Sequence, residues 1–240
     1  MKRLLTLGLA LVALAVAPSA ASAQSTIDAV FLAEYSAPTF TIDQGEIVVF
    51  RNRDPFLEHG VVSNARAGGE RRFDAGVAAP KGRRLVRGAP FLKANTYQFH
   101  CPVHPEMTAT LEVSANGQPL PRDSIEPTAA VKVRTKRLGT LLERRRVRFT
   151  VNPTEAEDLA IAARAGGVKL AAVERTYVEP GRRTLVLRIR KRAAKRLRAR
   201  VAQLERHDRR SLRLVVSADL ADVAGNEGVA TGSRRLAFPA

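Results

Sequence analysis

The chain has very few of the side chains that most often crosslink an exported protein or bind metals. Its 240 residues include one cysteine, four histidines, two methionines and no tryptophan. A single cysteine excludes an internal disulfide, the usual means by which small domains are stabilised in oxidising compartments. The thiol of Cys101 must therefore be buried, exposed to oxidation, or held by a metal.

Long apolar runs are also missing beyond the N-terminus. No later segment reaches the roughly 18 apolar residues that a transmembrane helix requires. Residues 1–23 contain the positive start MKR, an apolar run and the small-residue segment PSAASA, a pattern typical of a cleaved signal peptide. We therefore expect an exported protein that is periplasmic, cell-wall-associated or secreted, and that is not transmembrane.

Charge is distributed unevenly along the chain. Residues 24–127 carry 11 Lys and Arg against 12 Asp and Glu, whereas residues 128–240 carry 27 against 11. A segment rich in Pro, Asn and Gly, ANGQPLPRDSIEPTAA, lies where the balance changes and indicates a linker. The predicted organisation is a signal peptide at 1–23, a first domain at 24–115, a linker at 116–129 and a basic second domain at 130–240.

Both domains are predicted to be mainly β. Short runs rich in Val, Ile, Thr and Phe recur between Gly, Pro and Asn in the first domain, which is typical of a β-sandwich. Gly45 is expected to turn 38–42 and 46–52 into a hairpin. In the second domain we expect another β-sandwich with one basic amphipathic helix at 191–204, because Ala194, Leu197, Val201 and Leu204 share a helical face. Its DVAGNEG turn loosely resembles the last hairpin of bacterial immunoglobulin-like extracellular domains.

The segment TYQFHCPVHPEM holds the only cysteine of the chain. A strand period of two places Tyr97, Phe99 and Cys101 on an inward face and His100 on the opposite face. The loop that follows brings His104 and Met107 toward the same end of the sandwich, and His59 precedes another strand. A thiolate, two imidazoles and a thioether form the His₂Cys set with a weak axial Met that suits copper. Zinc fits less well, because its structural sites use cysteine and histidine rather than methionine.

A C-x-x-H pair alone is weak support for a metal, and the alternative interpretation of Met107 is a core methionine, although its spacing from Cys101 and His104 favours a ligand. The wider pattern resembles the cupredoxin family, specifically the plastocyanin–amicyanin branch of type 1 copper proteins. The similar segments are PTFTIDQGEIVVFRNRDPFLEHGVV, RFDAG and ANTYQFHCPVHPEMTATLEV. The resemblance implies a Greek-key sandwich and one type 1 copper ion bound by His59, Cys101, His104 and Met107. Gly60 departs from the family, which usually has Asn after the first histidine.

The resemblance also implies a function. A closed set of four ligands favours one-electron transfer over catalysis, so we expect a carrier and not an enzyme. By resemblance, His104 is the electron port where a redox partner docks, bordered by Pro55, Phe56, Leu57, Pro102 and Pro105. The alternatives are a copper module for storage, delivery or resistance, although the chain lacks Met- or His-rich tracts, and an attachment protein with a secondary copper site.

The remaining polar features have simple interpretations. His100 and His207 are expected at the surface. The basic helix is most simply a solvated face, and the alternative is contact with an anionic partner outside the cell. Nucleic acid is not expected as a partner, because no aromatic residues interleave the basic run to stack on bases.

Overall fold

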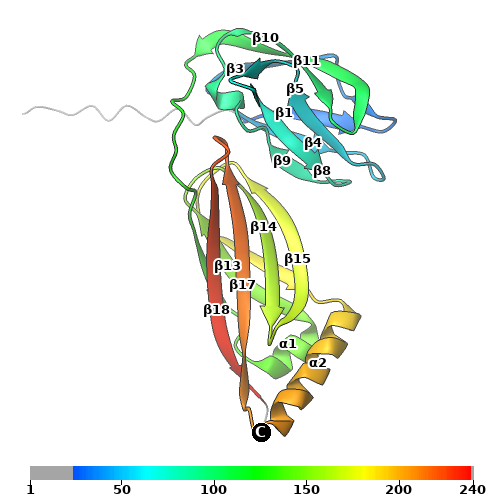
Figure 1. The fold of residues 1–240 in the computed structure, drawn as a ribbon, viewed down its shortest axis with the longest axis vertical. Helices are drawn as coiled ribbons and strands as arrows, with labels where there is room; N and C mark the ends of the chain where they lie inside the picture. The colour runs from blue at the N-terminus through cyan, green and yellow to red at the C-terminus, as the bar shows by residue number, and fades with distance from the viewer. Residues whose placement is uncertain (1–23, 239–240) are drawn as a thin grey trace, which may run out of the picture.

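The computed structural model describes residues 24–238, which form two β-sandwiches one after the other along the chain (Figure 1). The predicted mainly-β fold class is confirmed. The predicted signal peptide lies outside the described residues. Within 24–238, no helix combines the length and the apolar character needed to cross a bilayer.

The first sandwich consists of a four-stranded sheet, in the order β2-β1-β4-β9, and a five-stranded sheet, in the order β3-β11-β10-β5-β8. A separate two-stranded ribbon pairs β6 with β7, and a short 3₁₀ helix, η1, precedes β10. The elements are β1 (Gln24–Val30), β2 (Glu34–Tyr35), β3 (Thr39–Gln44), β4 (Ile47–Asn52), β5 (His59–Ser63), β6 (Arg66–Ala67), β7 (Glu70–Arg71), β8 (Asp74–Ala78), β9 (Arg83–Leu85), η1 (Ala89–Phe91), β10 (Asn95–Cys101) and β11 (His104–Gly117).

The hairpin expected at Gly45 is wrong. Gly45 does form a tight turn with φ +85°, but β3 pairs in parallel with β11 whereas β4 pairs in parallel with β1. The turn therefore carries the chain from one sheet to the other. Strand propensity located both strands, but their pairing depends on segments far away in the sequence.

Aromatic side chains fill the space between the two sheets of the first sandwich. Phe50, Phe73 and Phe99 are fully buried, and the rings of Tyr35 and Phe99 meet edge to face with centroids 4.9 Å apart. Edge-to-face contacts of this kind add stability beyond the area they bury. The same cluster includes Cys101, so the thiol belongs to the packed interior.

The second sandwich stacks a three-stranded sheet, in the order β12-β13-β16, on a four-stranded sheet, in the order β15-β14-β17-β18. The elements are β12 (Ala129–Val133), α1 (Leu138–Arg144), β13 (Arg146–Pro153), β14 (Glu157–Ala165), β15 (Val168–Tyr177), β16 (Arg183–Arg188), α2 (Lys191–Arg206), β17 (Ser211–Asp222) and β18 (Glu227–Ala237). The basic helix was predicted correctly: α2 buries Ala194, Leu197 and Val201 against the core.

Two elements of this sandwich were not predicted. α1 is only seven residues long, and its buried Leu138 and Leu141 are too few to produce a periodic pattern. β14 has the sequence EDLAIAARA, in which alanine obscures the alternation. Alanine favours helices, but here Ala163 and Ala165 lie on the buried face of the strand, so packing overrides local preference.

The two sandwiches contact each other through β9, the edge strand of the first. The backbone N–H of Leu85 donates to both carboxylate oxygens of Asp158 on β14, at 3.0 and 3.2 Å. The hydroxyl of Thr176 on β15 donates to the carbonyl of Arg83 at 3.0 Å. Apolar contact is added by a small cluster in which Val49 and Leu85 meet Ala156.

The main cores of the two sandwiches contain different residues, which predicts separable unfolding. Phe99→Ala should lower the stability of the first sandwich by about 3–5 kcal/mol, the usual cost of emptying a buried phenylalanine site. Phe149→Ala, at an equally buried position of the second core, should lower the stability of the second sandwich by a similar amount. Urea unfolding of the full chain should then show two transitions, and each variant should shift only the transition of its own sandwich. A single transition that both variants shift equally would contradict two independent cores.

Candidate metal centre

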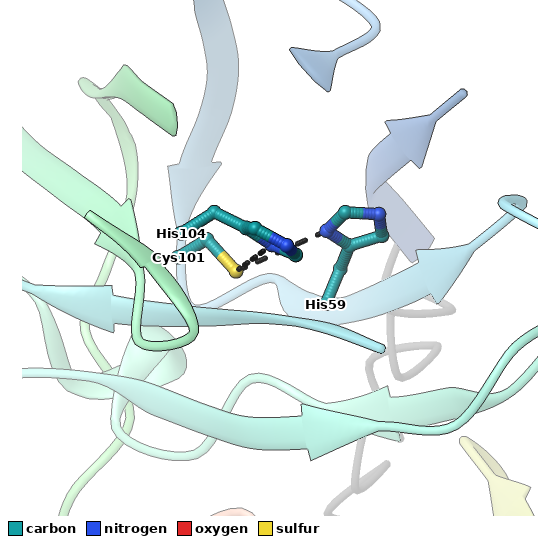
Figure 2. Close-up of side chains that lie close together, drawn as sticks. All are labelled: His59, Cys101 and His104. Carbon is teal, nitrogen blue, oxygen red and sulfur yellow. Dashed lines mark hydrogen bonds between the residues drawn. The ribbon is translucent and has the colours of Figure 1, made fainter. Parts of the chain in front are cut away.

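Three potential metal ligands meet at one end of the first sandwich (Figure 2). The Sγ of Cys101 lies 3.7 Å from Nδ1 of His104 and 4.0 Å from Nδ1 of His59. The two imidazole rings are tilted by 43° with centroids 4.8 Å apart. His59 and Cys101 are buried and His104 is partly exposed, so the group is reached from solvent on the His104 side.

Strand ends place all three side chains. β10 alternates as predicted, with Phe99 and Cys101 buried and His100 directed outward. Cys101 is the last residue of β10 and His104 the first residue of β11, and the two are paired across the turn between these strands. His59 opens β5, the strand beside β10, so the loop after β4 brings its imidazole to the same end.

Gly60 allows the backbone to approach the thiol closely. Its N–H points at Cys101 Sγ at 3.4 Å, and its carbonyl accepts a 2.6 Å hydrogen bond from the buried Tyr35 hydroxyl. A Cβ at this position would collide with the carbonyl oxygen of Gly76 and come within 3.0 Å of Pro102 Cδ. Glycine at this position is therefore a packing requirement of this chain.

Asp54 contacts the imidazole of His59 at Nε2, the ring nitrogen that does not face Cys101. Its Oδ1 accepts from the backbone N–H groups of Leu57 and Phe56, and these bonds lower the pKa of its carboxyl group. Its Oδ2 lies 3.3 Å from His59 Nε2, and both side chains are fully buried. Nε2 is thus the natural donor to this carboxylate, which leaves the Nδ1 lone pair free toward Cys101.

Asn52 fixes the loop that carries Asp54 and His59. Its Oδ1 accepts from the N–H of Asp54, and its Nδ2 donates to the carbonyls of Leu57, Ala78 and Ala79. One buried amide therefore ties the β4–β5 loop to the end of β8. Contacts within the protein therefore fix the imidazole of His59 without a metal ion.

The donor set fits a soft or borderline metal ion. Donor atoms bound to one ion at about 2.0 Å for nitrogen and 2.3 Å for sulfur lie roughly 3.5 Å apart at a tetrahedral angle. The Sγ–Nδ1 distances of 3.7 and 4.0 Å are close to that separation. A thiol and two imidazoles suit copper or zinc, whereas calcium and magnesium prefer oxygen.

The sequence also singled out Met107, His100 and His207, which differ in how deeply they are buried. Met107 is buried in the same core cluster as Cys101, and its role as a fourth ligand stays a prediction. His100 is half-buried, and its Nδ1 lies 2.6 Å from Asn64 Oδ1 on the outer side of β10. His207 is exposed at the end of α2.

Sequence reasoning missed the residues that support the ligands. Asp54 contacts His59, Tyr35 contacts the neighbouring Gly60, and Asn52 contacts the loop that leads to His59, yet none of the three belongs to the ligand pattern. The N-x-D spacing before His59 was a usable signal for two of them. Nothing local marks Tyr35, which comes from the separate strand β2.

No protein-family model and no curated protein matches the chain. Among solved structures, an oxidised methionine-to-leucine mutant of amicyanin is 22% identical, covering 38% of this chain and 81% of that one, with a TM-score of 0.32. The Cu(I) form of a methionine-to-alanine mutant of amicyanin is 24% identical with the same coverage and TM-score. At these scores the likeness does not establish a family, and the case for a metal centre rests on the geometry of His59, Cys101 and His104.

Tyr35 provides a test of the support around the ligands. Tyr35→Phe removes the hydroxyl that satisfies the buried Gly60 carbonyl and should lower the free energy of unfolding by about 1–3 kcal/mol. Tyr97→Phe is the matched control, because its hydroxyl bonds the exposed Lys93 carbonyl and should change stability by less than about 0.5 kcal/mol. Chemical denaturation measures both. Equal effects would mean that Tyr35 does not brace the loop.

Proposed function

We propose that the chain is an exported type 1 copper protein that carries single electrons between redox partners, with His59, Cys101, His104 and Met107 as the ligands. The observation that carries the proposal is the buried thiol of Cys101, set 3.7 and 4.0 Å from two imidazole nitrogens. Copper bound there would supply one-electron redox chemistry, for which sulfur and imidazole ligands are suited.

The residues around the site support a carrier because they restrict movement. Asp54 holds His59, Asn52 holds the loop that carries Asp54, and Tyr35 holds Gly60. A ligand set fixed in this way resists rearrangement, so one geometry serves both oxidation states. The Gly60 N–H directed at Cys101 Sγ adds one more fixed contact to the sulfur.

An exposed apolar patch surrounds the solvent side of the site. β1 and β4 run in parallel, so the residues that follow them lie at the same end of the sandwich as the β10–β11 loop. The rings of Phe31 and Phe56 are in edge contact there, with centroids 6.3 Å apart. The five residues proposed from the sequence are all exposed, and Phe31, Leu32 and Val103 are exposed in the loops after β1 and β10.

An apolar patch beside the partly exposed His104 suits brief docking of a redox partner. Four ligands leave no open position for a substrate, so we propose no enzymatic activity. Delivery of copper to an acceptor is the second candidate, favoured by the same solvent access. The basic second sandwich would add contact with an anionic surface outside the cell.

The metal assignment is tested by colour and by one substitution. Copper(II)-loaded protein should show an intense blue absorption that disappears reversibly on reduction, because a thiolate ligand gives strong charge transfer. Cys101→Ser should lose this band, since a hydroxyl does not replace the soft thiolate. His100→Ala, which removes an imidazole outside the site, is the control and should stay blue. A wild type with one tightly bound copper and only a pale band would refute the type 1 assignment.

An electron carrier and a copper-delivery protein differ in whether the reduced protein releases its copper. In a carrier, reduced protein should keep its copper against a moderate Cu(I) chelator through many electron-transfer turnovers. Phe56→Glu should slow electron exchange with a redox partner and leave the spectrum unchanged, because it places a charge in the apolar patch. Val229→Glu is a matched control in the second sandwich, since Phe56 and Val229 are both 74% exposed. Rapid loss of copper, with exchange unaffected by Phe56→Glu, would favour delivery.

A further inference from the structure

A basic surface with two hollows lies at one end of the second sandwich. This is the end where α1 and α2 are packed, away from the first sandwich (Figure 1). The first hollow, of about 440 Å³, is formed by the segment between β12 and α1, by α1 itself, and by exposed side chains of β13 and β16. Its basic side chains are Arg134, Lys136, Arg137, Arg144, Arg146 and Arg148.

The second hollow, of about 400 Å³, lies at the edge of the sandwich. It is formed by the start of β15, the end of β16 and the start of α2, and both strands are edge strands of their sheets. Its basic side chains are Lys169, Arg188, Arg190, Arg192 and Arg196. The hollows adjoin, because Arg146 of the first is the direct cross-strand partner of Arg188 of the second.

The sheet sets the spacing of these charges. Arg146 and Arg148 are exposed on the same face of β13, two positions apart, so they stand about 7 Å from each other. The paired Arg146 and Arg188 have Cα atoms about 5 Å apart. Arg134 lies beside Arg148, since its N–H donates to the Arg148 carbonyl at 2.8 Å. Successive cations are therefore held about 5–7 Å apart by the strands.

The cations have no counter-charge in the protein. Within residues 24–238, no Asp or Glu lines either hollow, and none of the eleven basic side chains forms an ion pair. Glu143, the acidic residue of α1, lines a neighbouring hollow. Charges of one sign that line a hollow focus their field and raise the local concentration of ions of the opposite sign.

The arrangement favours a polymer over other anionic ligands. Water and salt compete strongly for a single small anion at exposed side chains, whereas a chain of charges contacts many cations together and releases their counterions. A flat membrane surface would not enter two hollows that turn around an edge, and Val186 is the one large exposed apolar side chain that the described residues supply to their lining. No aromatic side chain of residues 24–238 lines them to stack on the bases of a nucleic acid.

We propose that the two hollows together bind a linear polymer that carries oxyanions, phosphate or carboxylate, at short intervals, and so hold the protein to an anionic matrix outside the cell. This makes specific the anionic contact of the proposed function, and it rests on export of the chain but not on the copper site. Because the hollows lie at the end away from the first sandwich, a bound polymer leaves the partly exposed His104 free for a redox partner (Figure 1).

The test is a binding titration of the copper-loaded full chain with short inorganic polyphosphate and with polyglutamate of equal charge. We expect the logarithm of the affinity to fall with the logarithm of salt at a slope of about −4, as when about six charges of a flexible polyanion are neutralised. The tighter of the two polymers identifies phosphate or carboxylate as the recognised group. The visible copper absorption should not change, and polymer binding by a protein with a pale copper band would refute the copper site alone.

Three results would overturn the proposal. The first is no binding of either polymer at low salt. The second is equal competition by free inorganic phosphate at the same phosphate concentration, which would show a site for a single ion. The third is tighter binding to single-stranded DNA of equal charge or to anionic lipid vesicles, which would show recognition of bases or of a membrane.

Two double variants locate the effect. Arg146→Gln with Arg188→Gln should weaken polyphosphate binding roughly tenfold and make the salt slope shallower by about 1.4, because two contacts are lost. Arg213→Gln with Arg235→Gln is the matched control: these exposed residues are also direct cross-strand partners, but they line neither hollow. The control should keep the full slope. Both variants should fold, since each removes a pair of facing like charges. Equal weakening by both would assign the binding to overall charge and refute the hollows.

Discussion

The close approach of three chain segments at Gly60 determines how the rest of the candidate metal centre is arranged. Its N–H faces the sulfur of Cys101, its carbonyl receives the Tyr35 hydroxyl, and its Cα faces Gly76 and Pro102 without room for a side chain. Because β5 and β10 are neighbours in one sheet, this approach also sets the separation of His59 from Cys101. A larger residue would collide with the Gly76 carbonyl on β8 and crowd Pro102, and would therefore displace the strand that carries His59.

The meeting of Cys101 with His104 was predictable from the sequence because the two residues are close along the chain. Strand alternation placed Cys101 inward and His100 outward, and a three-residue spacing placed His104 beside the thiol. The supporting contacts were not predictable in the same way. Tyr35 reaches Gly60 from a two-residue strand, and Asn52 reaches Ala78 across 26 positions, so these contacts exist only once the sheets are assembled.

Pairing between strands was the weakest part of the prediction for the same reason. The run at 38–42 and the run at 46–52 were both recognised as strands, yet they belong to different sheets because each pairs in parallel with a distant segment. In the second sandwich, Ala-rich β14 was missed although it lies between β15 and β17. Its neighbours on both sides, and not its own propensity, make it a strand. The amphipathic helix α2 was found because 16 residues repeat one pattern often enough to be read locally.

The contact between β9 and the second sandwich has a consequence for the behaviour of the protein at high concentration. An edge strand presents free N–H and C=O groups that recruit strands from other molecules. Here the outward N–H of Leu85 is occupied by Asp158 and the outward carbonyl of Arg83 by Thr176. Side chains, not a further strand, thus cap this edge. The second sandwich thereby shields this edge of the first sandwich from pairing with strands of other molecules.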